Sequence, residues 1–224
     1  GLVVALALIP EAIAFSILAG VDPMVGLYAS FIIAVTISFV GGRPAMISAA
    51  TGAMALVIVS LVKDHGLQYL LATTILTGVI QILFGVFNIA RLMKFIPNAV
   101  MIGFVNSLAI LVFIAQMPHF IGGDFMTWVF LLGTIALIYI IPFVIKGIPA
   151  PLIAVVLLSV TVVYLGIDLK TVGDMGAITQ SLPSFLIPDV PFNFETFKII
   201  LPYSLALAVV GLMESLLTAA ILDD

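Results

Sequence analysis

The sequence has few charged residues, and this scarcity decides the class of protein. Asp, Glu, Lys and Arg together make up 8% of the 224 residues, whereas hydrophobic residues make up 64%. A soluble domain carries about 25% charged residues, so this chain has too few to cover a surface that faces water. A helix that is apolar on all sides is stable in lipid. The composition therefore predicts an all-α, multi-pass protein of the plasma or inner cell membrane.

Several chemical groups that enzymes and metal sites need are also missing or rare. The chain has no cysteine, which excludes disulfides and thiolate chemistry, and its two histidines, His65 and His119, fall near segment ends. No phosphate-binding P-loop, dinucleotide fingerprint or His-Glu-x-x-His motif occurs. The net charge of −4 is spread over loops and forms no basic stripe for nucleic acid. We therefore expect neither an enzyme, nor a cofactor, nor a nucleic-acid partner.

Hydrophobic windows long enough to cross a bilayer divide the sequence into about eight candidate spans. One segment breaks this rhythm, because residues 167–197 carry five charged residues and three prolines. That segment is too polar to span and too long for a hairpin, so we expect an extramembrane connector with a short interfacial helix. The predicted spans are residues 2–19, 24–40, 46–62, 67–90, 96–117, 125–145, 149–166 and 198–220.

The third span begins in an unusual way. Arg43-Pro44 opens it with a helix breaker, and an uninterrupted apolar helix starts only at Thr51–Gly52 and runs to about Val62. Such a helix is too short to cross about 30 Å at 1.5 Å per residue. An extended stretch that leads into a half-helix near the midplane fits better. Irregular backbone at that depth is tolerated only where it lines a cavity or is buried in protein.

A helix that begins inside the membrane offers a site for an anion. Its first backbone N–H groups are unpaired and carry a partial positive charge, so no Lys or Arg is needed. The run from Ser48 to Ala53 suits such a site, because it supplies hydroxyls and small residues that let a ligand approach the backbone. The alternative is that these small residues serve tight helix packing.

Two carboxylates, Glu11 and Glu214, lie within the apolar spans. Charge at the bilayer centre costs roughly 2.5–3.5 kcal/mol, so such residues usually mark a pathway or a relay. Glu214 and Thr218 share a helical face, and their oxygens suit a bound Na⁺ or, at Glu214, a proton. Glu11 follows Pro10 and shares a face with Phe15, so both are candidates to line a ligand cavity. The alternatives are an interfacial helix-end glutamate for Glu214, and snorkelling or pairing with a neighbouring polar residue for Glu11.

Four motifs occupy roughly the first 60 residues. Pro-Glu-Ala-Ile-Ala-Phe (10–15) is followed by Ala-Gly (19–20), and Pro-Met-Val-Gly-Leu-Tyr-Ala-Ser (23–30) fits Pro-x-x-Gly-Leu-Tyr with two small residues after it. Gly-Gly-Arg-Pro (41–44) and Ile-Ser-Ala-Ala-Thr-Gly (47–52) come next. In this combination the chain resembles the SulP (sulfate permease) family of anion transporters. Since both ends fall at hydrophobic runs, we expect it to be the N-terminal part of a longer transmembrane domain.

The resemblance implies a fold of two inverted seven-segment repeats, as in uracil permease. A core domain would bind the substrate and a gate domain would scaffold it. Residues 1–94 and 198–224 would belong to the core, residues 95–166 to the gate, and residues 167–197 would form the connector. The site of such proteins lies between half-helices of the third and tenth segments, of which this chain would hold the third. The full-length protein is expected to be a homodimer with a further repeat and a cytoplasmic STAS domain.

Carried over by position, the resemblance implies substrate contacts at Thr51, Gly52 and Ala53, with Glu11 and Phe15 lining the site. Glu11 stands where many relatives have Gln. A fixed negative charge beside an anion is unfavourable unless the carboxylate is protonated or screened by a cation. That departure hints at linkage to protons.

The last span carries the second implied site. Glu214 and Thr218 match positions at which a bicarbonate-transporting branch binds Na⁺ with an Asp and a Thr, whereas relatives with Glu there suggest coupling to protons. We therefore predict secondary active transport of a small inorganic oxyanion, sulfate first, coupled to H⁺ or Na⁺ by an elevator-like movement of core against gate. A sodium-dependent bicarbonate transporter and a passive anion channel are the alternatives.

Overall fold

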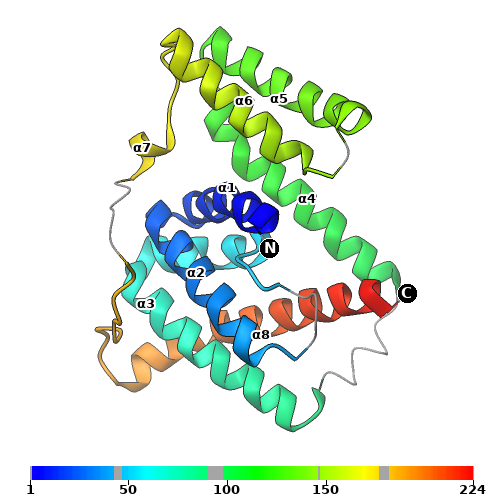
Figure 1. Ribbon diagram of the computed structural model, residues 1–224. Coiled ribbons are helices and arrows are strands. Elements are labelled where there is room, and N and C mark those ends of the chain that lie inside the picture. The colour runs from blue at the N-terminus through cyan, green and yellow to red at the C-terminus, as the bar shows by residue number, and fades with distance from the viewer. Residues whose placement is uncertain (1, 43–46, 90–97, 146, 177–181, 224) are drawn as a thin grey trace.

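The computed structural model describes residues 2–42, 47–89, 98–145, 147–176 and 182–223 (Figure 1). Within these ranges the chain forms helices joined by turns and extended segments, and no strand occurs. The all-α class predicted from the composition is thereby confirmed. The helices are α1 (Leu2–Ala19), α2 (Pro23–Val40), α3 (Gly52–Val86), α4 (Asn98–Phe120), α5 (Phe125–Val144), α6 (Ala150–Leu165), α7 (Val172–Met175) and α8 (Phe194–Asp223).

Helix α3 contains the half-helix that the sequence predicts. Gly66 interrupts α3 at φ 80° and ψ −176°, a conformation that a residue with a side chain rarely adopts. Residues 52–65 and 67–86 are therefore two consecutive helices, and we call residues 52–65 the half-helix. It is about 21 Å long at 1.5 Å per residue, shorter than the roughly 30 Å of a bilayer core. Extended chain precedes it, with Thr51 at φ −125° and ψ 149°, while Arg43-Pro44 lies outside the described residues.

Each predicted span overlaps one helix of the described residues once the two parts of α3 are counted separately, although the third span begins in extended chain before Gly52. By length and composition, α2, α3, α5 and most of α4 and α8 are able to cross a membrane, and α1 and α6 are shorter apolar helices. Helix α8 begins at Phe194, earlier than the predicted residue 198. The reason is a helix cap, because the side-chain oxygen of Asn193 accepts a hydrogen bond from the backbone N–H of Thr196 at 2.7 Å.

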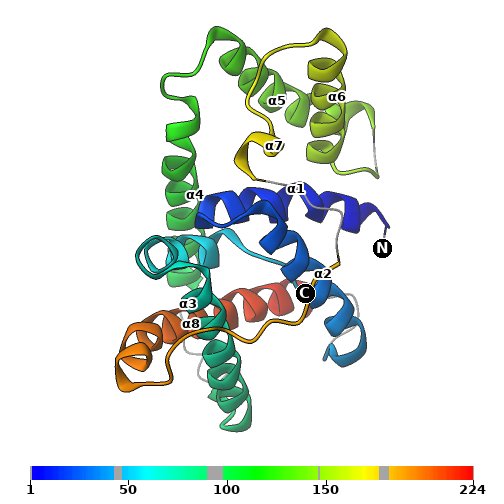
Figure 2. The ribbon, with the colours of Figure 1, turned by 90° about the vertical axis from the view of Figure 1, so that its left-hand side faces the viewer.

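The helices form two groups, which Figures 1 and 2 show toward opposite ends of the molecule. In the first group, α3 packs along α8 and against α1, and α1 also packs against α2. In the second group, α5 packs against α6. Helix α4 runs between the groups and contacts α3 over a short stretch. This arrangement brings the beginning of α3 next to both α8 and α4.

Small residues and hydroxyls set the closest contacts inside the first group. A Cβ atom added to Gly26 of α2 would overlap the Ser16 hydroxyl of α1 and lie 2.6 Å from the carbonyl oxygen of Ala12, so only glycine fits at this crossing. Between α3 and α8, the hydroxyl of the buried Ser204 donates to the carbonyl oxygen of Thr73 at 3.1 Å. Such contacts are typical of helices that associate in membranes. They hold α8, and with it Glu214, in a fixed register along α3.

The chain between α6 and α8 is mostly extended and includes the short helix α7. A capping box stabilises α7, because the backbone N–H and the hydroxyl of Thr171 both donate to the carboxylate of Asp174, at 2.6 and 2.8 Å. Farther along, the backbone N–H of Asp189 donates to the side-chain oxygen of Gln68 on α3 at 3.0 Å. The connector is therefore attached to the first group of helices at this point.

Candidate functional site

The beginning of the half-helix has backbone N–H groups that are available to hydrogen-bond a ligand. The Thr51 hydroxyl accepts a hydrogen bond from the N–H of Met54 at 3.4 Å, and the Thr51 carbonyl oxygen accepts one from the N–H of Ala55 at 3.0 Å. The first N–H groups of an α-helix have no partner inside the helix. The Ala55 bond is the first regular bond of the helix, and the Thr51 side chain satisfies Met54. Among the described residues, the N–H groups of Gly52 and Ala53 are therefore left without a partner, and both residues are buried.

Thr51 also contacts Glu214, which lies 163 residues away in the sequence. The Thr51 hydroxyl donates a hydrogen bond of 2.8 Å to the Oε2 atom of Glu214, and both side chains are half-buried. A hydroxyl has one proton and two lone pairs, so Thr51 caps the helix and binds the carboxylate at the same time. The predicted substrate residue and the predicted ion-coupling residue are therefore in direct contact, which the sequence does not reveal.

Two apolar side chains enclose the first residue of the half-helix. A Cβ atom on Gly52 would lie 3.0 Å from Cε1 of Phe15 on α1 and 3.3 Å from Cγ2 of Val112 on α4. Phe15 is thus beside the predicted site, on the side of α1. Val112 is not among the predicted residues, and nothing distinguishes it from the other apolar residues of α4 in the sequence. The structure identifies it by its contact alone.

Glu11 and Thr218 are less closely tied to this site. Glu11 is exposed and has no hydrogen-bonding or ionic partner among the described residues, so its role in lining the site stays a prediction. The Thr218 hydroxyl is exposed and donates to the backbone carbonyl oxygen of Glu214 at 2.9 Å, within its own helix. Its proton is therefore not directed at the Glu214 carboxylate, although its lone pairs could still face a cation. The shared Na⁺ site also stays a prediction.

A cavity adjoins the half-helix on the side of α4. Its volume is about 250 Å³, and nearly all the side chains that line it are apolar. Ala53 of the half-helix is one of the residues that line it, so the cavity adjoins the first turn of the half-helix. The lining residues are Ala53, Leu56 and Val57 of α3, Phe104, Ser107, Leu108 and Leu111 of α4, and Val210 of α8.

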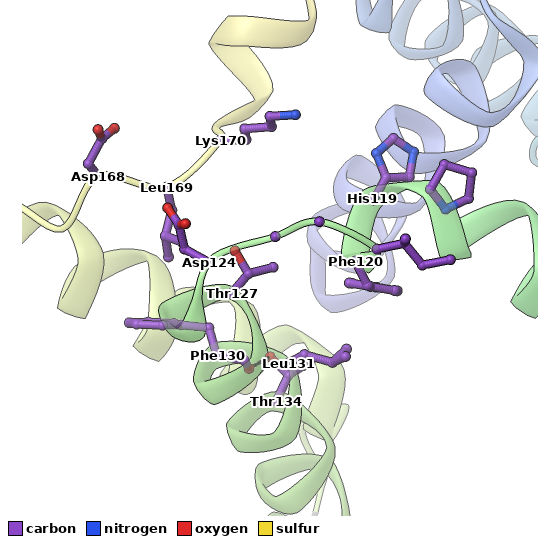
Figure 3. A pocket seen from close by; sticks show the side chains of 14 residues that line it. His119, Phe120, Asp124, Thr127, Phe130, Leu131, Thr134, Asp168, Leu169 and Lys170 are labelled. Carbon is purple, nitrogen blue, oxygen red and sulfur yellow. Dashed lines mark hydrogen bonds between the residues drawn. The ribbon is translucent and has the colours of Figure 1, made fainter.

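A larger cavity, of about 600 Å³, lies elsewhere (Figure 3). It is formed by the turn between α4 and α5 and by residues 168–170 of the connector, and none of the predicted site residues lines it. Charged side chains of both signs line it, namely Lys170 and the carboxylates of Asp124 and Asp168, and His119 lies on the same side of the view as Lys170. Size alone therefore does not identify the functional site of this chain.

Comparisons with known proteins identify the family. The profile described as "Sulfate permease family" matches residues 1–136 and 122–224. Over all 224 residues the chain is 63% identical to YbaR of Bacillus subtilis (strain 168), whose name describes it as a candidate sulfate transporter. It is 30% identical to YvdB of the same organism, named in the same way. The chain covers 47% of each relative, so it spans about half of their length.

A solved structure supports the same conclusion. The whole chain superposes on the transmembrane domain of a cyanobacterium bicarbonate transporter, BicA, with a TM-score of 0.81 and 25% sequence identity, and covers 64% of that chain. The predicted uracil-permease-like arrangement of helices, including the half-helix, is thereby confirmed. With the profile and the sequence identity over its full length, these findings show that the chain belongs to the sulfate permease family.

Proposed function

We propose that the full-length protein is a secondary active transporter of a small inorganic oxyanion, with sulfate as the first candidate. Membership of the family and the names of its relatives support transport of an anion. The observation that carries the proposal further is the hydrogen bond between Thr51 and Glu214. It joins a group of anion donors at a helix terminus to a carboxylate that is able to bind a coupling ion.

The two halves of this site oppose each other electrostatically. The N–H groups of Gly52 and Ala53 and the dipole of the half-helix favour an anion. A charged Glu214 disfavours it, because two like unit charges about 5 Å apart repel each other by roughly 3 kcal/mol at an effective dielectric constant of about 20. A proton or a Na⁺ ion on Glu214 removes this repulsion. Binding of the anion and of the coupling ion therefore favour each other, as a symporter requires.

Movement of a core against a gate is the second part of the proposal. The predicted core contains α1, α2, α3 and α8, which pack together, and the predicted gate contains α5 and α6, which pack on each other. Helix α4 belongs to the gate in this division and contacts α3 over a short stretch only. The predicted boundary at residues 94 and 95 lies outside the described residues. The two groups also meet where α1 contacts α6 over a short stretch. Small interfaces of this kind are compatible with a sliding or rocking movement of one group against the other.

The same experiment tests two alternative functions. The structural similarity to a bicarbonate transporter favours sodium-dependent bicarbonate uptake as the second candidate. A passive anion channel would use the same backbone donors without coupling. Channel and carrier differ in that only the carrier accumulates its substrate against a gradient.

The test uses the full-length protein in proteoliposomes. Labelled sulfate and labelled bicarbonate are offered under an imposed Na⁺ gradient and then under a proton gradient, and we expect accumulation of one anion with one gradient. Glu214→Gln should abolish this accumulation, because the amide binds neither a proton nor a cation in the same way. Glu195→Gln, in the exposed first turn of the same helix, is the matched control and should behave like the unaltered protein. Unchanged accumulation by Glu214→Gln would remove the coupling role, and anion conductance without accumulation would favour the channel.

A further inference from the structure

One face of α4 is turned toward the half-helix. Phe104, Leu108 and Leu111 of α4 line the 250 Å³ cavity beside Ala53, and Val112 approaches Gly52. These four residues are spaced at i, i+4, i+7 and i+8, which places them on one side of a helix. Apart from Ser107, which also lines the cavity, the side chains on this face are apolar. These apolar side chains cannot hydrogen-bond to an anion, so their influence on a ligand at the half-helix depends on shape and volume.

Among these residues, Val112 lies nearest to the start of the half-helix. A Cβ atom on Gly52 would meet Val112 at 3.3 Å and the Phe15 ring at 3.0 Å, which is closer than ordinary van der Waals contact. Phe15 from α1 and Val112 from α4 therefore pack directly against Gly52 and leave no room on its Cβ side even for a methyl group. An anion that binds the N–H groups of Gly52 and Ala53 has to fit beside these two side chains.

Phe15 and Val112 differ in how firmly the packing of their helices fixes them relative to the half-helix. Phe15 belongs to α1, which packs on α3 and α2, and so keeps its position relative to the half-helix. Val112 belongs to α4, which contacts α3 over a short stretch and is bordered there by the cavity. A change in the volume of residue 112 is thus able to alter the free space at the site without rearranging the packing of α1 against α3.

We propose that Val112 determines which anions fit at the start of the half-helix, by the volume that its side chain occupies directly beside Gly52. This inference rests on the proposed function, because it assumes that the anion binds at the start of the half-helix. A wall of this kind discriminates by steric exclusion, and one methylene group in an apolar pocket changes selectivity by about 10-fold to 200-fold. A residue that no motif marks would then decide between anions of different radius.

The experiment compares a smaller and a larger side chain at position 112. The full-length protein in proteoliposomes carries Val112→Ala or Val112→Leu, and unlabelled bicarbonate, sulfate, selenate and molybdate compete with the labelled substrate. The quantity measured is the ratio of the inhibition constants of molybdate and sulfate, within one preparation, so that differences in the folded fraction cancel. Val112→Ala should shift this ratio in favour of the larger anion by about 10-fold, and Val112→Leu should shift it the other way.

Ile114 supplies the matched control. It is 57% exposed and lies about 200° around α4 from Val112, so Ile114→Ala and Ile114→Leu should leave the ratio unchanged. An unchanged ratio in both Val112 variants, or equal shifts at positions 112 and 114, would overturn the inference. The proposed function fails in a different way, since the unaltered protein would then accumulate none of these anions.

Discussion

The hydrogen bond between Thr51 and Glu214 makes a quantitative prediction about stability. The perturbation is Thr51→Val, which keeps the shape of the side chain and removes its hydroxyl. It is made in the unaltered protein and again in a Glu214→Met background, where the carboxylate is already absent. Met resembles Glu in length, so Glu214→Met removes the acceptor while it leaves little empty volume.

The magnitude follows from the two interactions of the Thr51 hydroxyl. Loss of an N-cap costs about 1 kcal/mol. Loss of a hydrogen bond to a charged group costs about 1.5–3 kcal/mol, and we take the lower end because both side chains are half-buried. Thr51→Val should therefore lower the free energy of unfolding by about 2.5 kcal/mol in the unaltered protein and by about 1 kcal/mol in the Glu214→Met background.

The assay is denaturant titration of the full-length protein in mixed micelles, with the four proteins of the double-mutant cycle compared under identical conditions. Thr51→Ser retains both hydrogen bonds and serves as the control, with a change smaller than about 0.5 kcal/mol. If Thr51→Val costs the same in both backgrounds to within about 0.5 kcal/mol, the two side chains are not coupled and the reasoning is refuted.

Two further predictions concern contacts outside the candidate site. Gly26→Ala should lower the free energy of unfolding by about 1–3 kcal/mol, because the new Cβ would press against the Ala12 carbonyl oxygen, whereas Gly78→Ala meets no neighbouring atom and serves as the control in the same titration. Hydrogen bonds from Thr171 hold the pKa of Asp174 below its ordinary value, so the capping box of α7 is stable above the pKa of a free aspartate and is lost as pH falls through the lowered pKa. Hydrogen exchange at the Thr171 amide should therefore stay slow at neutral pH and lose protection only in acid, and equal exchange in the Asp174→Asn variant at neutral pH would contradict this.

The positions of the helices could be predicted from the sequence because hydropathy and helix breakers indicate where each span begins and ends. The half-helix is an example, since the sequence before Thr51 excludes a regular helix of full length and Gly66 ends the segment as a turn residue would. Helix α8 begins at Phe194, before the predicted span at 198–220, because Asn193 caps it. Hydropathy marks the apolar part of a helix and misses a polar first turn such as this one.

The contacts between helices could not be predicted, and the reason is physical. A soluble helix shows its buried side by an apolar stripe, whereas helices in lipid are apolar on all sides and show no such stripe. Val112 and Ile114 therefore look alike in the sequence, although one lies against Gly52 and the other is exposed. The contact of Thr51 with Glu214 is hidden for a second reason, because it joins segments 163 residues apart.

If the protein is a coupled transporter as proposed, the single proton of the Thr51 hydroxyl provides a local mechanism for the coupling. In this structure the proton is directed at Glu214, so an arriving anion has to use the N–H groups of Gly52 and Ala53 or displace Glu214 as the acceptor. Displacement becomes easier once a proton or cation has neutralised the carboxylate, because an uncharged acceptor binds a hydroxyl less strongly. Exchange of one hydrogen bond would then link the two ligands without direct contact between them. It follows that Thr51→Ser should keep the dependence of anion affinity on the coupling ion and Thr51→Val should weaken it, and full dependence in Thr51→Val would contradict this mechanism.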